Sequence, residues 1–246
     1  MAPATAAGSE KDPKDLIVAF NRLRRAERAV RDGKFQEALP DLRSLVAEEP
    51  KNAFARLVLG SAYLGMRDHA RAVEQLKTYA ALVPTSAHAR QSLAVAYANL
   101  GDRTAALREA GAAAALDPRL TDARLLRAGI LSGQGRRREA IEELRAAVAA
   151  APERPELRMS LGEVLLDANQ AKEAEAEYRT IVGQDASAAQ SGGALLAEAR
   201  FGLAVALERQ GRAAEARAEY ERVLDDAHAP AEVRAAARAR LGAKAG

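Results

Sequence analysis

The sequence predicts an all-α fold built from stacked helix–turn–helix units, and three observations support this prediction. Proline recurs every 34 residues, at Pro50, Pro84, Pro118 and Pro152. Arginine follows the same spacing at Arg22, Arg56, Arg90, Arg124 and Arg158. Turns that contain glycine, such as Gly101 and Gly135, fall between the prolines. A fixed period of this length indicates that one small structural unit is copied along the chain.

The first unit shows how each helix is expected to begin and end. Residues 1–11 are small and polar, and they are predicted to form a flexible tail. Asp12 is suited to cap a helix that starts at Pro13 and runs to about Arg31. The turn at 32–33 ends this helix, and a second helix is expected from residue 34 to about Glu48. The following units repeat this order of cap, helix, turn and helix.

The copies share one register. They align from Ala19, Ala53, Ala87, Thr121, Pro155 and Ala197, each counted as position 1. Position 8 is then always alanine or glycine, and position 20 is always alanine, so the two helices of a unit can approach closely. Larger side chains at positions 11 and 24 are expected to fill the space between the helices. The pattern, clearest in residues 59–63 with Ala72 and Pro84, resembles the tetratricopeptide repeat.

The resemblance implies an α-solenoid of six helix–turn–helix repeats that form a right-handed superhelix. The expected repeats are 12–52, 53–86, 87–120, 121–154, 155–196 and 197–230. The fifth contains an insertion around Ser187 to Ala194. Residues 231–246 are expected to form a helix that caps the last repeat, as stacked repeats require.

Positions 2, 5, 9 and 12 of each first helix share one face. In this family that face lines a concave groove where partners dock, so the resemblance implies a noncatalytic adaptor for a peptide or partner helix. The candidate binding residues are Phe54, Leu57, Ser61, Leu64, His88, Gln91, Val95, Leu125, Met159, Glu163, Leu166, Phe201 and Val205. Each large apolar residue among them would gain about 1.5–3 kcal/mol if a partner with an apolar stripe buried it. The alternative is that neighbouring side chains cover one another within the stack.

Charge adds two expectations. Glu156, Glu163 and Glu198 give the C-terminal part of the face an acidic edge, which suits a partner with a basic end. The arginines at position 4 are expected to tie each unit to the preceding one, through carbonyls or acids such as Glu48 and Asp117. The alternative is a line of cations that binds an anionic polymer or nucleic acid.

Composition argues against a reaction centre. The chain has no cysteine, three histidines in different units and a net charge of +3. It contains no metal-ligand spacing, glycine-rich phosphate loop or nucleophile motif, so no catalytic residue, metal or cofactor is expected. No apolar run reaches the roughly 18 residues of a membrane span, and the first residues do not resemble a signal peptide. The expected location is cytoplasmic, or periplasmic if the natural N-terminus lies upstream.

Two further hypotheses remain open. Asp12 to Ile17, followed by Phe20 and Asn21, resembles the junction between bacterial sulfatase-type hydrolase domains and tetratricopeptide tails. On this hypothesis the chain is a C-terminal accessory region of a larger enzyme. The other is self-association, in which a neighbouring copy fills the apolar groove.

Overall fold

The computed structural model describes residues 12–185 and 193–242, which form α-helices joined by short turns. The predicted all-α fold is therefore confirmed. The chain divides into two compact parts of several repeats each, which we call the first unit (Met1–Leu116) and the second unit (Asp117–Gly246). The helices of the first unit are α1 (Pro13–Arg31), α2 (Phe35–Glu48), α3 (Ala53–Gly65), α4 (His69–Leu82), α5 (Ala87–Leu100) and α6 (Arg103–Leu116). Those of the second are α7 (Thr121–Gly133), α8 (Arg137–Ala150), α9 (Pro155–Asp167), α10 (Ala171–Asp185), α11 (Gly193–Arg209), α12 (Ala213–Asp225) and α13 (Ala231–Gly242).

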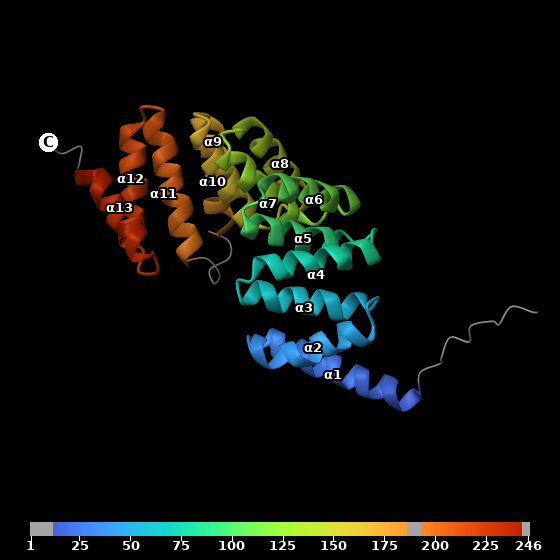
Figure 1. Ribbon diagram of the computed structural model, residues 1–246. Coiled ribbons are helices and arrows are strands. Elements are labelled where there is room, and N and C mark those ends of the chain that lie inside the picture. The colour runs from blue at the N-terminus through green and yellow to red at the C-terminus, as the bar shows by residue number, and fades with distance from the viewer. Residues whose placement is uncertain (1–11, 186–192, 243–246) are drawn as a thin grey trace, which may run out of the picture. The chain divides into compact units, whose positions relative to one another are not determined.

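Within each unit, every helix packs against the next one along the chain (Figure 1). Polar side chains fix where several of the helices begin. The carboxylate of Asp12 accepts a hydrogen bond from the backbone N–H of Lys14 at 2.8 Å, as expected for a cap. Asn52 caps α3 through the N–H of Ala55 at 3.0 Å. Such caps satisfy backbone donors that the first helical turn leaves without a partner.

The turn inside each helix pair uses a left-handed backbone at position 15 of the register. Four of these positions are glycines with positive φ: Gly33, Gly101, Gly135 and Gly211. Arg67 and Asn169 occupy the same position in the second and fifth repeats, with φ of 59° and 62°. Glycine adopts this conformation without steric cost, whereas arginine does not. The geometry of the turn is therefore imposed by the helix packing even where the sequence does not favour it.

Small and large side chains alternate in the core as the register predicts. The six alanines at position 20 are at most 1% exposed: Ala38, Ala72, Ala106, Ala140, Ala174 and Ala216. One turn later on the same helices, the larger side chains at position 24 are also buried, among them Leu42, Leu76, Leu144 and Tyr178. In the first unit Ala38, Ala72, Leu42 and Leu76 belong to one cluster that also includes Tyr63 and Leu93. This packing fixes the orientation of the first helix of each repeat, and the candidate binding residues lie on that helix.

The position-4 arginines correct one prediction from the sequence. In the first five repeats they bind the second helix of their own repeat, through an acid or amide 19 residues later, rather than the preceding repeat. Arg90 reaches Glu109 at 2.9 Å, Arg124 reaches Glu143 at 3.1 Å, and Arg158 reaches Glu177 at 2.7 Å. Arg56 reaches Gln75 in the same way at 2.9 Å. It also donates to the Pro50 carbonyl at 2.7 Å, which is the kind of contact that was expected.

The ends of the predicted segments differ slightly from the structure. The capping helix begins at Ala231 as expected and ends at Gly242. The tail at 1–11, most of the insertion, and residues 243–246 lie outside the described residues. Helix α11 begins at Gly193, within the range expected for the insertion.

Candidate functional site

In the first unit the candidate residues lie on α3 and α5, and their exposure differs. Phe54 is 44% exposed, and His88 is also exposed. Leu57 and Leu64 are half-buried because they pack against the core cluster of this unit. Ser61, Gln91 and Val95 are likewise half-buried. The residues that a partner could reach most fully here are Phe54 and His88.

In the second unit, three of the candidate apolar residues are covered by the chain itself. Met159 and Val205 are each 9% exposed, and Leu166 is 8% exposed. Neighbouring side chains of this unit cover these three residues, because α9 and α11 contact each other as well as the α10 helix between them in sequence.

Leu125 and Phe201 remain partly accessible in this unit. Leu125 packs at the edge of a small cluster that contains Ala147 and Leu157. The Phe201 ring lies 5.5 Å from the Tyr220 ring, at an interplanar angle of 56°. This tilted aromatic contact fixes the Phe201 ring while leaving part of it accessible.

Three carboxylates gather on the same unit, and we call Glu163, Asp167 and Glu198 the acidic cluster. Loss of solvation raises the pKa of Glu163, and the negative charges of Glu198 and Asp167 raise it further. Its surface nevertheless remains open to solvent. Among the described residues, none of the three carboxylates forms an ion pair with an arginine or lysine. The cluster is thus an uncompensated negative site in a chain whose other acids are widely paired.

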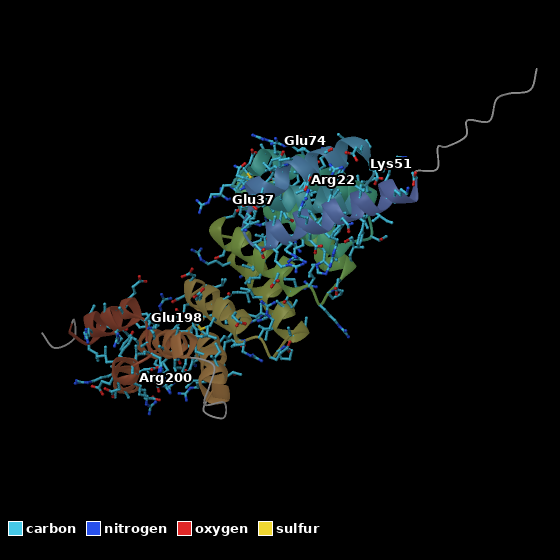
Figure 2. The ribbon with its side chains drawn as sticks, turned by 90° about the horizontal axis from the view of Figure 1, so that it is seen from below. Arg22, Glu37, Lys51, Glu74, Glu198 and Arg200 are labelled. Atoms are coloured by element: carbon cyan, nitrogen blue, oxygen red, sulfur yellow. The ribbon has the colours of Figure 1, made fainter. Side chains whose placement is uncertain are left out.

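The sequence anticipated the acidic edge only in part. Glu163 and Glu198 do lie near each other, but Glu156 does not belong to this group in the structure. Arg154 lies between the carboxylates of Asp122, at 2.7 Å, and Glu156, at 4.0 Å, and partly neutralises both. Asp167 was missed, although its spacing of four residues from Glu163 places both on one helix face. Figure 2 labels Glu198 and Arg200 on α11.

A buried tyrosine packs between the two helices that carry the acidic cluster. Tyr178 of α10 is 1% exposed and fits between Gly162 of α9 and Gly202 of α11. A Cβ atom at either glycine would lie 2.5 Å from the Tyr178 Cζ atom, so only glycine leaves room for the ring. Burial raises the pKa of Tyr178, and the nearby charges of Glu163 and Asp167 raise it further. The ring therefore holds α9 and α11 at the spacing that brings the carboxylates together.

The position-4 arginines already donate to acids or amides, so they do not form a free line of cations. Within the described parts of the chain, no group of three or more histidine, cysteine or acidic side chains is placed to hold a metal ion. No described helix is long and apolar enough to cross a membrane.

A tetratricopeptide-repeat family model matches residues 29–94 and 131–198, and a second one matches residues 187–232. The chain belongs to the tetratricopeptide-repeat family. No curated protein matches the sequence. The likeness of the N-terminal segment to a sulfatase-linked tail finds no support in these comparisons.

Solved structures of other tetratricopeptide-repeat proteins resemble the chain in fold. PilW, described as a widely conserved type IV pilus biogenesis factor, has a TM-score of 0.69 and 18% identity, over 89% of this chain and 98% of its own. MamA from Desulfovibrio magneticus RS-1 has a TM-score of 0.62 and 21% identity, over 71% of this chain and 97% of its own. YrrB, described as having an unusual peptide-binding site, has a TM-score of 0.63 and 16% identity, over 80% of this chain and 97% of its own.

Tetratricopeptide-repeat proteins are generally noncatalytic interaction modules that bind proteins or peptides. Membership of the family therefore supports a role for this chain as a scaffold for protein interaction.

Proposed function

We propose that this tetratricopeptide-repeat protein binds a peptide segment on the first-helix face of its second unit. The segment combines a basic residue with an apolar residue. The observation that carries the proposal is the acidic cluster, in which the exposed Glu163 lies near Glu198 and Asp167 and none of the three pairs with an arginine or lysine among the described residues. A bound lysine or arginine would relieve the repulsion among the three carboxylates. It would also gain a charge-assisted hydrogen bond.

The apolar part of the segment is assigned to Phe201, which is partly accessible on α11. Its ring is already fixed by Tyr220, so little side-chain freedom is lost on binding. Met159, Leu166 and Val205 are buried, so they would lie beneath the bound segment and would not contact it directly. Charge then selects the partner, and the aromatic ring adds affinity.

The face of the first unit is proposed as a second contact region, with Phe54 and His88 as its accessible residues. The half-buried Leu57, Ser61, Leu64, Gln91 and Val95 would line it, as Leu125 would line the face of the second unit. The acidic cluster sets the specificity.

Defined peptides test the proposal directly. Fluorescence anisotropy would compare a leucine-containing peptide that carries arginines with the same peptide in which glutamates replace them. The basic peptide is expected to bind, and its affinity is expected to fall as salt rises. For the Glu163→Gln/Glu198→Gln variant we expect about tenfold weaker binding or more, because two charges of the site are lost. The Phe201→Ala variant should also weaken binding, because the aromatic contact is lost without a change of charge.

The matched control is Glu74→Gln, which removes an exposed carboxylate from a second helix of the other unit (Figure 2). Circular dichroism would verify that all variants remain helical. The proposal is wrong if the acidic-cluster variant binds the basic peptide as tightly as the wild type does. It is also wrong if the acidic peptide binds equally well.

A further inference from the structure

The start of α1 carries large apolar side chains that the other described residues of its unit leave exposed. Leu16, Ile17, Val18 and Phe20 are 50%, 60%, 57% and 62% exposed. They lie directly before or after Ala19, where the repeat register begins. Helix α1 begins earlier, at Pro13, so its first turns lie outside the repeat register. Figure 1 shows these first turns of α1 projecting past α2. We call residues 12–20 the α1 overhang.

The other end of the chain has the complementary feature. Each of α3, α5, α9 and α11 packs between the helices that precede and follow it, whereas α13 has α12 on one side and no described helix after it (Figure 1). An open pocket lies between α12 and α13 where the next helix of a continued stack would pack. Its apolar lining comes from Ala213, Ala214, Tyr220 and Leu241. Arg217 and Arg240 also line it.

We propose that the α1 overhang of a second copy of this chain docks into the α12–α13 pocket. The pocket lacks a helix with an apolar side, and the overhang is a helix whose apolar side lacks a partner. In this arrangement the overhang continues the stack of its neighbour. It buries the side chains of Leu16 and Phe20 against small alanines and Leu241.

The charges of the two surfaces agree with this pairing. The overhang carries Asp12 and Asp15 against Lys14, and it is therefore net acidic. The pocket is lined by two arginines and no acid. Each arginine pairs with one acid of its own chain, Arg217 with Glu221 at 2.9 Å and Arg240 with Glu208 at 3.4 Å. Both are more than half exposed, so they can turn toward an incoming carboxylate.

The contact joins two different surfaces of the same chain. Such a heterologous contact leaves a free overhang at one end of the assembly and a free pocket at the other. Association is therefore expected to continue beyond a dimer as the concentration rises. A symmetric contact between two α1 helices would instead stop at a dimer and leave both pockets empty.

Single cysteines can distinguish these arrangements, because the chain has no cysteine of its own. Ile17→Cys marks the overhang, Ala214→Cys marks the pocket, and Ala81→Cys is an exposed control on α4. The full-length variants would be mixed in pairs and oxidised mildly. We expect the Ile17→Cys and Ala214→Cys chains to form a mixed disulfide dimer in excess over every pair that includes Ala81→Cys. The chain that carries both Ile17→Cys and Ala214→Cys should form a ladder of covalent oligomers.

Light scattering over a concentration series gives the second measurement. The wild type should gain mass with concentration, and Phe20→Glu should weaken association by about tenfold to a hundredfold, since one large apolar contact is lost. Phe20 is 62% exposed, so the variant should keep its helical content. Disulfide dimers of Ile17→Cys alone would overturn the proposal in favour of the symmetric contact. Cross-linking no stronger than that of the control, or a mass that stays monomeric at all concentrations, would overturn it as well.

Discussion

Arg90 of α5 and Glu109 of α6 are joined across the two helices of one repeat, with 2.9 Å between Arg90 Nη1 and Glu109 Oε2. The Glu109 side chain is 8% exposed and that of Arg90 is 29% exposed. The pair is therefore largely removed from water, and the same pairing recurs in other repeats. Its contribution depends on both partners being present, because an isolated charge in such a place is costly.

For Arg90→Met we expect the free energy of unfolding to fall by about 1–3 kcal/mol, because the buried Glu109 loses a charge-assisted hydrogen bond and keeps only the more exposed Arg108 as a partner. The double variant Arg90→Met/Glu109→Leu should recover part of this loss, since the buried carboxylate is gone and Arg108 is exposed to solvent. Urea denaturation followed by circular dichroism measures both values. The pair Arg31 and Glu27 on the surface of α1 provides the control, and Arg31→Ala should change stability much less. Equal losses for Arg90→Met and Arg31→Ala would contradict the prediction.

The glycines beside Tyr178 should not tolerate a methyl group. For Gly202→Ala we expect a loss of about 1–3 kcal/mol, because the new Cβ overlaps a ring that is enclosed on all sides. Gly129 in the middle of α7 is the matched control, since a Cβ there would meet nothing within 4 Å. Gly129→Ala should raise stability by about 0.5–1 kcal/mol through helix propensity alone. Thermal unfolding of the two variants measures the contrast, and a stabilised Gly202→Ala protein would refute the prediction.

The turn at Arg67 can be improved by substitution. Its φ of 59° places a side chain in the left-handed region, where glycine stands in four other repeats. We expect Arg67→Gly to stabilise the protein by about 1 kcal/mol, since the steric cost of the Cβ atom disappears. The reverse change, Gly101→Ala, should destabilise it by a similar amount, because Gly101 has φ of 90°. Denaturant midpoints of both variants measure these changes. The prediction requires a higher midpoint for Arg67→Gly and a lower midpoint for Gly101→Ala than for the wild type.

Glu163 predicts how stability depends on pH. Its pKa is raised in the folded chain by lost solvation, by Glu198 and by Asp167, so the folded state holds this proton more tightly than the unfolded state does. Ionisation of Glu163 therefore opposes folding, and its cost is fully present above the raised pKa. We expect Glu163→Gln to unfold at a higher temperature than the wild type at neutral pH. The gain should vanish as the pH falls below the ordinary glutamate value of 4.5. A gain that persists in acid would show that the carboxylate charge is not the cause.

The fold followed from the sequence because it depends on local periodicity. The small residues at positions 8 and 20 and the larger ones at position 24 form the core that their spacing predicts. Turns were predicted where glycine stands, and Arg67 and Asn169 adopt the same backbone. Asparagine enters this conformation readily, whereas at Arg67 the packing of the two flanking helices overrides the local preference.

The candidate site was less accessible to prediction because burial depends on neighbours from other repeats. Helical spacing placed Met159 and Val205 on the binding face, but contact between α9 and α11 buries them. The arginine partners were missed for a related reason. The spacing of 19 residues between Arg90 and Glu109 becomes a contact only once the turn between the helices is known. That spacing recurs in the sequence and could have indicated the pairing.

The internal pairing of each position-4 arginine has a consequence for how such a chain can change its length. Arg90 and its acceptor Glu109 both lie within one 34-residue period, so duplication or loss of that period adds or removes both charges together. A gene rearrangement of this kind leaves no buried carboxylate behind without its cation. Ion pairs between repeats, such as Arg145 with Glu173 and Arg212 with Glu175, depend instead on which repeat comes next. A change of length by whole repeats therefore alters the pairs at the junctions and leaves the internal pairs in place.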